Sequence, residues 1–403
     1  MKIAVIGGGP AGVIAAIELA KNDQEVIIFE KNNRILKKLL ATGNGRCNYT
    51  NNYVSSENYN CKDNFVENVL EEFTRDNLID YFKLMGIEPV LENRGKIFPV
   101  TLKANTVVNT LLEELDDLRI EVLLDSEVLS IKKKNKFSVK TKEKSFEFDK
   151  VIFAVGGSSM PSSGSDGKSY KILENLGHNK IETFPALTQL KLSSDYLKSL
   201  SGVKVVGDVK LLENNKIIDK RNGDLLFTNY GISGPPILDL SRKVNEKNKK
   251  LEIEMPLINN IEDIKEFRNL LYSRFYTLSH FSLERWLMGL VDKKFINMIL
   301  KESNLKAETP LDLIEISDLE KLLNILLKSR FTVIGTKGFE NSQVTCGGIA
   351  TSEINKDTLE SNIIDDLYIV GEVMDVDGDC GGYNLQWAFS SGIVAARSIL
   401  SRI

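Results

Sequence analysis

The residues with the clearest chemical prospect form a glycine turn near the start of the chain. Gly7, Gly9 and Gly12 have the spacing Gly-x-Gly-x-x-Gly, between the apolar run 2–6 and a helical pattern. Such a turn lets a pyrophosphate approach backbone N–H groups at the N-terminus of a helix. Glu30 follows about 20 residues later, at the end of a second apolar run, where a carboxylate accepts hydrogen bonds from an adenosine ribose. This order favours a dinucleotide site, for NAD or FAD, over a plain turn beside an unrelated acid.

A second polar segment near the C-terminus favours FAD over NAD. An apolar run is followed by Gly371, a series of acids, Gly381-Gly382 and a long helical pattern. An extended flavin reaches from a first helix to a distant one, whose N-terminus can face the electron-rich edge of the reduced ring. We expect one acid of this segment to accept a hydrogen bond from a ribityl hydroxyl, with a solvated acidic turn as the alternative. The acids are Glu372, Asp375, Asp377 and Asp379.

A parallel sheet is needed to position these residues. The ranges 2–6, 11–21 and 25–29 have the order strand, helix, strand of a βαβ unit. The apolar run 150–155 stops at two glycines, as a buried parallel strand does. Helical patterns are expected at 65–72, 77–85 and 105–115, and a three-stranded meander within 128–148. The predicted class is therefore α/β.

The middle of the chain has a different residue pattern. From 188 to 258 short strands alternate with polar turns, which predicts a small β-barrel. Helical patterns follow over 259–330. We therefore predict an inserted substrate domain at 188–330, and an FAD-binding domain made of 1–187 and 331–403.

Composition excludes some classes of function. The chain has 403 residues and a net charge of −4, from 52 Lys and Arg against 56 Asp and Glu. No sequence-wide basic field is available, so no nucleic-acid partner is predicted. No apolar stretch is long enough for a membrane span, and glycines interrupt the N-terminal apolar run. A cytoplasmic location is expected. With two histidines and four cysteines that form no CxxC pair, we predict no metal site and no Ser–His–Asp relay.

Seven long segments resemble a known family. They are GGGPAG at 7–12, KKLLATGNGRCNYTN at 37–51, GKIFPVTLKA at 95–104, FAVGGSSMPSSGSDG at 153–167, LLFTNYGISGPPIL at 225–238, TCGGIATSEI at 345–354 and GEVMDVDGDCGGYNLQWAFSSG at 371–392. The chain resembles the YhiN/BaiN-like family of NAD(P)/FAD-dependent oxidoreductases, some members of which are described as aminoacetone oxidases. The resemblance implies noncovalent FAD on a Rossmann-like domain of the glutathione-reductase and fumarate-reductase type, with an inserted β-barrel and helices.

The resemblance also places individual segments at the cofactor. It implies that the loop 42–48 lies near the flavin ring, where the amides of Asn44 and Asn48 suit hydrogen bonds to ring heteroatoms. The turn 164–167 resembles a glycine–acid turn of related flavoproteins, although Asp166 could also cap a helix. In the insert, Asn229 stands where relatives commonly have histidine. If that histidine is an acid or base in relatives, this protein uses another group, such as Tyr230 or a water, or has another substrate. The catalytic candidates are Asn44, Asn48 and Tyr230.

The predicted cofactor-binding residues extend along the chain. They are Gly7, Gly9, Pro10, Ala11, Gly12, Glu30, Lys31, Lys38, Thr42, Gly43, Asn44, Arg46, Cys47, Asn48, Val128, Ala154, Gly156, Gly157, Asp166, Gly371, Glu372, Asp375, Gly382, Tyr383, Asn384 and Leu385.

The predicted function is hydride transfer between flavin N5 and a small organic substrate. No second glycine turn follows a strand, so a separate nicotinamide domain is not expected, although NAD(P)H could reduce the flavin directly. The alternatives are a flavin-dependent redox sensor without steady turnover and an NAD-binding dehydrogenase.

Overall fold

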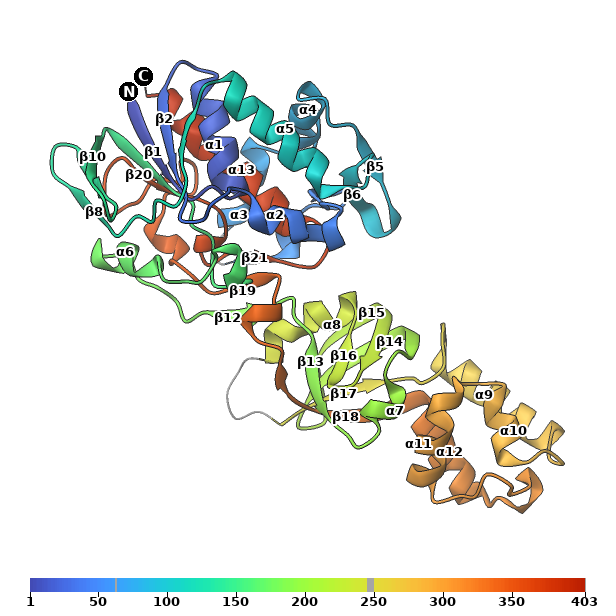
Figure 1. The fold of residues 1–403 in the computed structure, drawn as a ribbon. Coiled ribbons are helices and arrows are strands. Elements are labelled where there is room, and N and C mark those ends of the chain that lie inside the picture. Colours follow the sequence, from blue (N-terminus) through green and yellow to red (C-terminus); the bar gives the residue numbers. More distant parts are fainter. Residues whose placement is uncertain (62–63, 245–249, 403) are drawn as a thin grey trace. The chain divides into compact units, whose positions relative to one another are not determined.

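The computed structural model describes residues 1–61, 64–244 and 250–402 (Figure 1). It divides into two compact units, Met1–Ala186 with Phe339–Ile403, and Leu187–Gly338. The boundaries proposed from the sequence lie at 187/188 and 330/331, whereas the units meet at 186/187 and 338/339. The first unit thus uses both ends of the chain.

The first unit is built on a parallel sheet of five strands. Their order across the sheet is β20 (Leu367–Ile369), β11 (Lys150–Phe153), β1 (Lys2–Ile6), β2 (Glu25–Phe29) and β7 (Glu121–Leu123). Val5 pairs with Ile28 on one side and Ile152 on the other. The central strands are continuous apolar runs because both faces of the sheet are covered. The helix Pro10–Ala20 packs on β1 and β2, and Phe146 and Phe148 pack edge-on against Phe29 of β2. All five strands run in one direction, so the segments that follow them gather at one edge. The predicted α/β class is confirmed.

Two helices from opposite ends of the chain pack together in this unit. Helix α1 (Pro10–Ala20) lies beside α13 (Tyr383–Leu400) (Figure 1). A Cβ atom on Gly392 would lie 2.4 Å from the carbonyl oxygen of Ala11, so the two backbones approach closely only because this residue is glycine. The packing brings the C-terminal segment to the N-terminal glycine turn.

Smaller elements surround the sheet. The remaining helices of this unit are α2 (Lys37–Ala41), α3 (Phe65–Glu72), α4 (Arg75–Leu84), α5 (Ala104–Asp117) and α6 (Tyr170–Asn175). The short strands are β3 (Thr50–Asn51), β4 (Tyr59–Asn60), β5 (Pro89–Leu91), β6 (Lys96–Pro99), β8 (Ser130–Lys133), β9 (Phe137–Lys140), β10 (Ser145–Phe148), β12 (Phe184–Ala186), β19 (Val344–Cys346) and β21 (Asp377–Gly378). Strands β8, β9 and β10 form the predicted meander.

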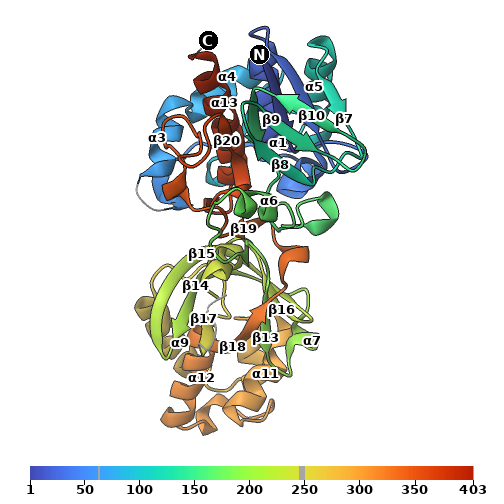
Figure 2. The same ribbon diagram turned by 90° about the vertical axis from the view of Figure 1, so that its left-hand side faces the viewer.

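The second unit consists of a closed barrel and a group of helices (Figure 2). The barrel strands are β13 (Leu190–Ser193), β14 (Lys204–Glu213), β15 (Lys216–Thr228), β16 (Gly231–Ser233), β17 (Leu251–Met255) and β18 (Ser329–Thr336). The helices are α7 (Leu197–Leu200), α8 (Pro235–Leu240), α9 (Ile264–Thr277), α10 (Leu283–Met288), α11 (Lys293–Ser303) and α12 (Ile316–Lys328). Strand β18 pairs with both β13 and β17 and so closes the barrel.

Each unit has its own apolar core. Alternate residues of β14, from Val205 to Leu211, are buried inside the barrel, the pattern of a strand with one face on a core. Phe227 packs edge-on against Phe295 and Phe331 there. Among the residues that the structure describes, no helix combines the length and apolar character needed to cross a membrane.

Candidate functional site

The glycine turn leaves open space at the start of α1. Gly9 precedes the helix in an extended conformation, and no side chain of the described residues caps it. A Cβ atom on Gly9 would come no closer than 4.0 Å to its nearest neighbour, the oxygen of Ala154. On Gly7 a Cβ would lie 2.4 Å from that oxygen, and on Gly12 it would lie 2.1 Å from the oxygen of Gly7. Gly7 and Gly12 therefore permit backbone packing, while Gly9 leaves room for a phosphate at a helix N-terminus.

Glu30 is held against this turn. Its side chain is buried, and one carboxylate oxygen accepts the Gly8 N–H at 2.9 Å. The other oxygen accepts the backbone N–H and the side-chain amide of Asn32, at 2.9 and 2.6 Å. The backbone oxygen of Glu30 accepts the N–H of Ser126, which lies two residues before the buried Val128. Asn32 was not among the predicted residues, although its bonds to Glu30 span only two positions.

The turn 163–167 lies beside Glu30. The amide of Asn32 donates to the Ser163 oxygen at 3.2 Å, and Lys31 forms an ion pair with Asp166 at 2.7 Å. Burial opposes ionisation of Asp166, but hydrogen bonds from Lys31 and from the Lys168 N–H outweigh it and hold the pKa of Asp166 below its usual value. The Lys168 bond lies in the turn before α6, which begins at Tyr170 and has no side-chain cap, so Asp166 does not cap this helix. Asp166 is instead held by Lys31, and its predicted role at the cofactor stays a prediction.

A second ion pair joins two predicted residues that are 334 positions apart. Lys38 and Glu372 approach to 2.5 Å, with about a fifth of each side chain exposed. The other oxygen of Glu372 accepts the Thr345 N–H at 2.9 Å. A Cβ on Gly157 would lie 2.4 Å from the Thr345 hydroxyl. Thr345, which the sequence-based prediction missed, thus fixes Glu372 beside the glycines that follow β11.

The N-terminus of α13 has a buried polar neighbour. Gly382 precedes this helix with φ of 104°, and no described side chain caps it. Asn48 is buried next to it, and the Asn48 Oδ1 atom has no hydrogen-bond partner among the described residues. A Cβ on Gly382 would lie 2.9 Å from that oxygen. Asn51, which was not predicted, donates from its amide to the Gly381 oxygen at 2.8 Å and holds the two segments together.

This arrangement fits the pyrimidine edge of a flavin. That edge carries one N–H donor, N3, between carbonyl acceptors. An unpaired buried oxygen on Asn48 can accept from the donor, and the uncapped N–H groups of α13 can donate to an acceptor. The open space at Gly9 and the acid at Glu30 suit the diphosphate and the adenosine of the same molecule. The residues present therefore fit FAD.

Other predicted residues of the 42–48 loop make contacts within the protein. Arg46 donates two hydrogen bonds to Glu92, at 3.1 and 3.0 Å, and lies over the Phe98 ring. Cys47 is fully buried, and burial raises the pKa of its thiol to about 12. A thiol with this pKa stays protonated at neutral pH, so Cys47 is not suited to nucleophilic chemistry. Asn44 is exposed and has φ of 57°.

The remaining predicted residues divide between the two units. The side chain of Asn384 accepts the Gly378 N–H and donates to the Gly378 oxygen, both at 2.8 Å. The Tyr383 carbonyl accepts the hydroxyl of Tyr59 at 2.8 Å. Tyr230 belongs to the second unit, where the ammonium of Lys337 lies 4.4 Å from the centre of its ring.

A Ser–His–acid chain occurs although the sequence offered little material for one. His178 Nδ1 lies 3.2 Å from Glu353, and its Nε2 lies 3.0 Å from the Ser361 hydroxyl. Burial lowers the pKa of His178, although the nearby Glu353 carboxylate raises it. Ser361 is buried, and its oxygen also accepts the N–H groups of Ile363 and Ile364, at 3.0 and 2.9 Å. A hydroxyl oxygen engaged in this way is a poor nucleophile, so this chain is a structural clamp.

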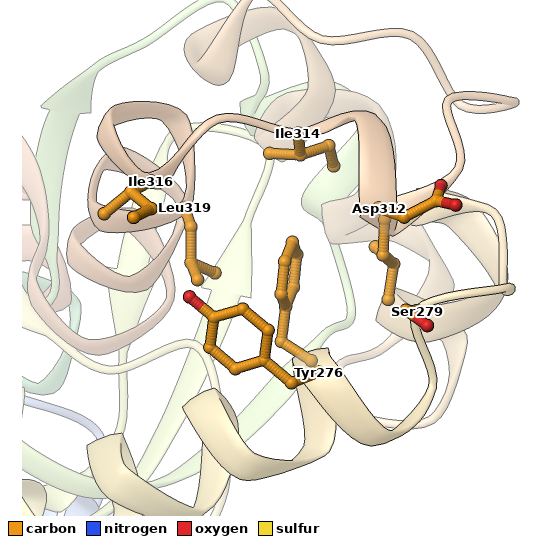
Figure 3. Close-up of a pocket in the computed structure, with 8 residues that line it drawn as sticks. Tyr276, Ser279, Asp312, Ile314, Ile316 and Leu319 are labelled. Carbon is orange, nitrogen blue, oxygen red and sulfur yellow. The ribbon is translucent and has the colours of Figure 1, made fainter.

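The second unit contains an apolar pocket of about 290 Å³ among its helices (Figure 3). Tyr276 from α9 lies opposite Leu319 from α12. Phe275 and Ile316 also line the pocket. Ser279 and Asp312 supply the polar atoms at its rim.

Comparison with known proteins places the chain in a family. The family described as "HI0933-like protein Rossmann domain" matches residues 1–398. The chain belongs to this family. The resemblance found in the sequence is thereby confirmed.

Two kinds of named relatives match over nearly the whole length. A "3-dehydro-bile acid delta(4,6)-reductase" of Clostridium scindens is 33% identical, covering 100% of this chain and 99% of the relative. A "Ribosomal RNA dihydrouridine synthase" of Haemophilus influenzae is 30% identical, covering 98% and 97%. Among solved structures, a 3-ketosteroid delta1-dehydrogenase from Sterolibacterium denitrificans matches with 11% identity and a TM-score of 0.51, covering 100% and 99%. At that identity the likeness shows a shared fold.

Proposed function

We propose that this HI0933-like protein is an FAD-dependent reductase that saturates a carbon–carbon double bond conjugated to a carbonyl group. The carrying observation is the pair of uncapped helix N-termini, at Gly9 and Gly382, with the unpaired oxygen of Asn48 beside the second. These features suit the two ends of one extended flavin nucleotide. The names of two relatives suggest the reaction class.

The enzyme class follows from the similarity to known proteins. The chain is a flavin-dependent oxidoreductase of the HI0933-like family, as the sequence predicted. The named relatives are a reductase and a synthase, which are turnover enzymes. The alternative of a redox sensor without turnover has no support among them.

Both relatives' names describe the same bond change. A delta(4,6)-reductase acts on double bonds conjugated to a 3-oxo group of a bile acid. A dihydrouridine synthase saturates the C5=C6 bond of uracil, which is conjugated to the C4 carbonyl. In each case a hydride adds to the carbon remote from the carbonyl and a proton adds to the neighbouring carbon. We infer that the protein described here catalyses this reaction.

The protein's own residues would bind and orient the reactants. Gly9 and the start of α1 would receive the diphosphate, Glu30 the adenosine ribose, and Asn48 with the start of α13 the flavin pyrimidine. Bound FAD, once reduced by the electron donor, would supply the hydride. Lys38 and Glu372 neutralise each other next to Thr345, so they add no net charge beside the cofactor.

The electron donor is proposed to be NAD(P)H. The reaction consumes one hydride per double bond, and the chain has a single Gly-x-Gly-x-x-Gly turn followed by a helix. A nicotinamide would therefore have to reduce the flavin directly before substrate binds. A cytoplasmic location, where NAD(P)H is available, is proposed with it.

The two units differ in charge, which bears on the class of substrate. The second unit has 24 Lys and Arg against 20 Asp and Glu, a formal charge of +4. The rest of the chain has 28 against 36, or −8, which together give the −4 of the whole. The expectation that no nucleic acid binds relied on the whole-chain sum, and that sum hides a basic insert. RNA therefore stands beside a steroid-like small molecule as a candidate substrate.

The test is anaerobic reduction followed by a choice of acceptors. FAD-loaded protein is reduced with NADH or NADPH, and the loss of flavin absorbance is followed. A 3-oxo-Δ4,6 steroid, uridine-containing ribosomal RNA and oxygen are then offered separately as electron acceptors. Aminoacetone is offered as an electron donor to a separate sample in which the FAD is still oxidised. We expect reoxidation by the steroid or the RNA, with a product heavier by two hydrogen atoms. Reduction of the flavin by aminoacetone, with reoxidation by oxygen alone, would instead identify an amine oxidase.

A further inference from the structure

Tyr53, in the segment that follows Asn48, is exposed, and one side of its ring contacts the protein backbone. Tyr53 has 65% of its surface exposed. A Cβ on Gly95 would lie 2.6 and 2.7 Å from two atoms of the Tyr53 ring, so the ring lies directly against the Gly95 backbone. The Tyr53 N–H donates to Asn51 Oδ1 at 3.0 Å. The Tyr53 backbone is thus fixed by Asn51 and one side of the ring lies against Gly95, while much of the residue faces solvent.

The chain places this ring close to the candidate cofactor site. Tyr53 follows β3, and β3 pairs with β6, whose first residue follows Gly95. Asn51, at the end of β3, donates to both the Arg94 oxygen and the Gly381 oxygen, at 3.1 and 2.8 Å. The Asn51 side chain therefore connects the Arg94–Gly95 segment, which contacts Tyr53, to the loop before α13. The ring lies at the edge of the segment that contains Asn48.

Cationic side chains accompany the ring. Arg94 is exposed, lies next to Gly95 at φ of 61°, and has no ion-pair partner in the described ranges. Arg75 donates to the Asn52 side chain at 3.0 Å and also pairs with Asp76. A supported aromatic ring with an unpaired guanidinium nearby has the two elements that bind unstacked nucleotides. The ring stacks on a base, and the cation meets a phosphate.

We infer that Tyr53 and Arg94 form a stacking platform for a nucleotide of an RNA substrate. This inference rests on the proposed function. An enzyme that reduces a uracil ring must first take the base out of its stack, and an exposed aromatic ring replaces part of the lost stacking. A 3-oxo-Δ4,6 steroid has no aromatic base to stack on Tyr53 and no phosphate for Arg94. The platform therefore favours RNA over a steroid.

The test measures RNA binding separately from reduction. The probe is fluorescent oligouridine of about ten nucleotides, bound to full-length, FAD-loaded protein and followed by anisotropy at several salt concentrations. Loss of one base–aromatic stack in Tyr53→Ala should weaken binding between about 5-fold and about 150-fold. Tyr53→Phe keeps the ring and should bind as the parent does. Arg94→Gln should reduce the slope of log affinity against log salt by about 0.7.

A matched control distinguishes the platform from nonspecific binding of the oligonucleotide to an exposed tyrosine. Tyr276, 58% exposed in the second unit, is replaced by alanine in the same way. Equal weakening in Tyr53→Ala and Tyr276→Ala overturns the platform, and so does a parent protein that binds no oligouridine. If the steroid is reduced while oligouridine is not bound, the platform fails and the proposed function stands. If oligouridine binding depends on Tyr53 while no acceptor is reduced, the platform stands and the proposed function fails. Flavin absorbance and thermal unfolding of each variant confirm that it is folded and loaded.

Discussion

The glycine turn allows cofactor binding to be separated from folding by two single substitutions. Gly9 has φ of −83°, which alanine adopts without strain, and a Cβ there has 4.0 Å of clearance in the protein alone. Gly9→Ala should therefore leave the protein without FAD as stable as the parent, or more stable by about 0.4–1 kcal/mol, since it restricts the unfolded chain. The same Cβ occupies the space that a phosphate needs.

The expected loss of FAD affinity follows from that space. Losing one charge-assisted hydrogen bond at the start of α1 costs about 1.5–3 kcal/mol, which raises the Kd of FAD by about 10- to 150-fold. At an FAD concentration about 100 times the parent's Kd, FAD stabilises the parent by about 2.7 kcal/mol. A variant that binds 100-fold more weakly would gain about 0.4 kcal/mol. Unfolding with and without FAD, together with a titration of flavin fluorescence, measures both quantities.

Gly12→Ala is the matched control because its Cβ would lie 2.1 Å from the Gly7 oxygen. It should destabilise the protein without FAD by about 1–3 kcal/mol, the cost of overpacking. Two opposite signatures are thus expected from neighbouring glycines. Parent-like FAD affinity in Gly9→Ala, in protein that unfolds normally, would refute the assignment of this turn to the cofactor diphosphate.

Three further substitutions test the rest of the site. Asn48→Leu removes a buried unpaired acceptor, so the FAD-free protein should be no less stable than the parent. FAD should bind about tenfold more weakly. A calorimetric titration measures the affinity, and an unchanged affinity contradicts the prediction. Glu372→Gln breaks the ion pair with Lys38 and should cost about 1–2 kcal/mol of unfolding free energy, a loss that should shrink when Lys38→Met is already present. His178 has a lowered pKa in the folded protein, so the unfolded chain takes up a proton first as pH falls through about 6.5, and stability is lost on the acidic side. His178→Gln should lose less stability than the parent between neutral and mildly acidic pH in urea unfolding, and identical pH profiles would remove His178 from this role.

The sequence by itself determined the parts of this protein that depend on short-range geometry. The glycine turn, Glu30 and the strand–helix–strand order are set by backbone conformation and periodicity within about 30 residues. The α/β class, the family and the flavin chemistry followed from these features and from the resemblance. Helix α3 has the predicted bounds and the meander lies within the predicted range, because apolar spacing is a local signal.

Tertiary structure alone decided which distant side chains meet. The Thr345 N–H donates to Glu372, and the Asn51 amide donates to the loop before α13. His178 lies within hydrogen-bonding distance of both Glu353 and Ser361. Of these contacts, the one between Asn51 and Gly381 joins residues 330 positions apart. No local pattern encodes such a partner, because the contact exists only after the sheet brings its strand ends to one edge. Strand β18 shows the same limit, since closing a barrel depends on strands far away in the sequence.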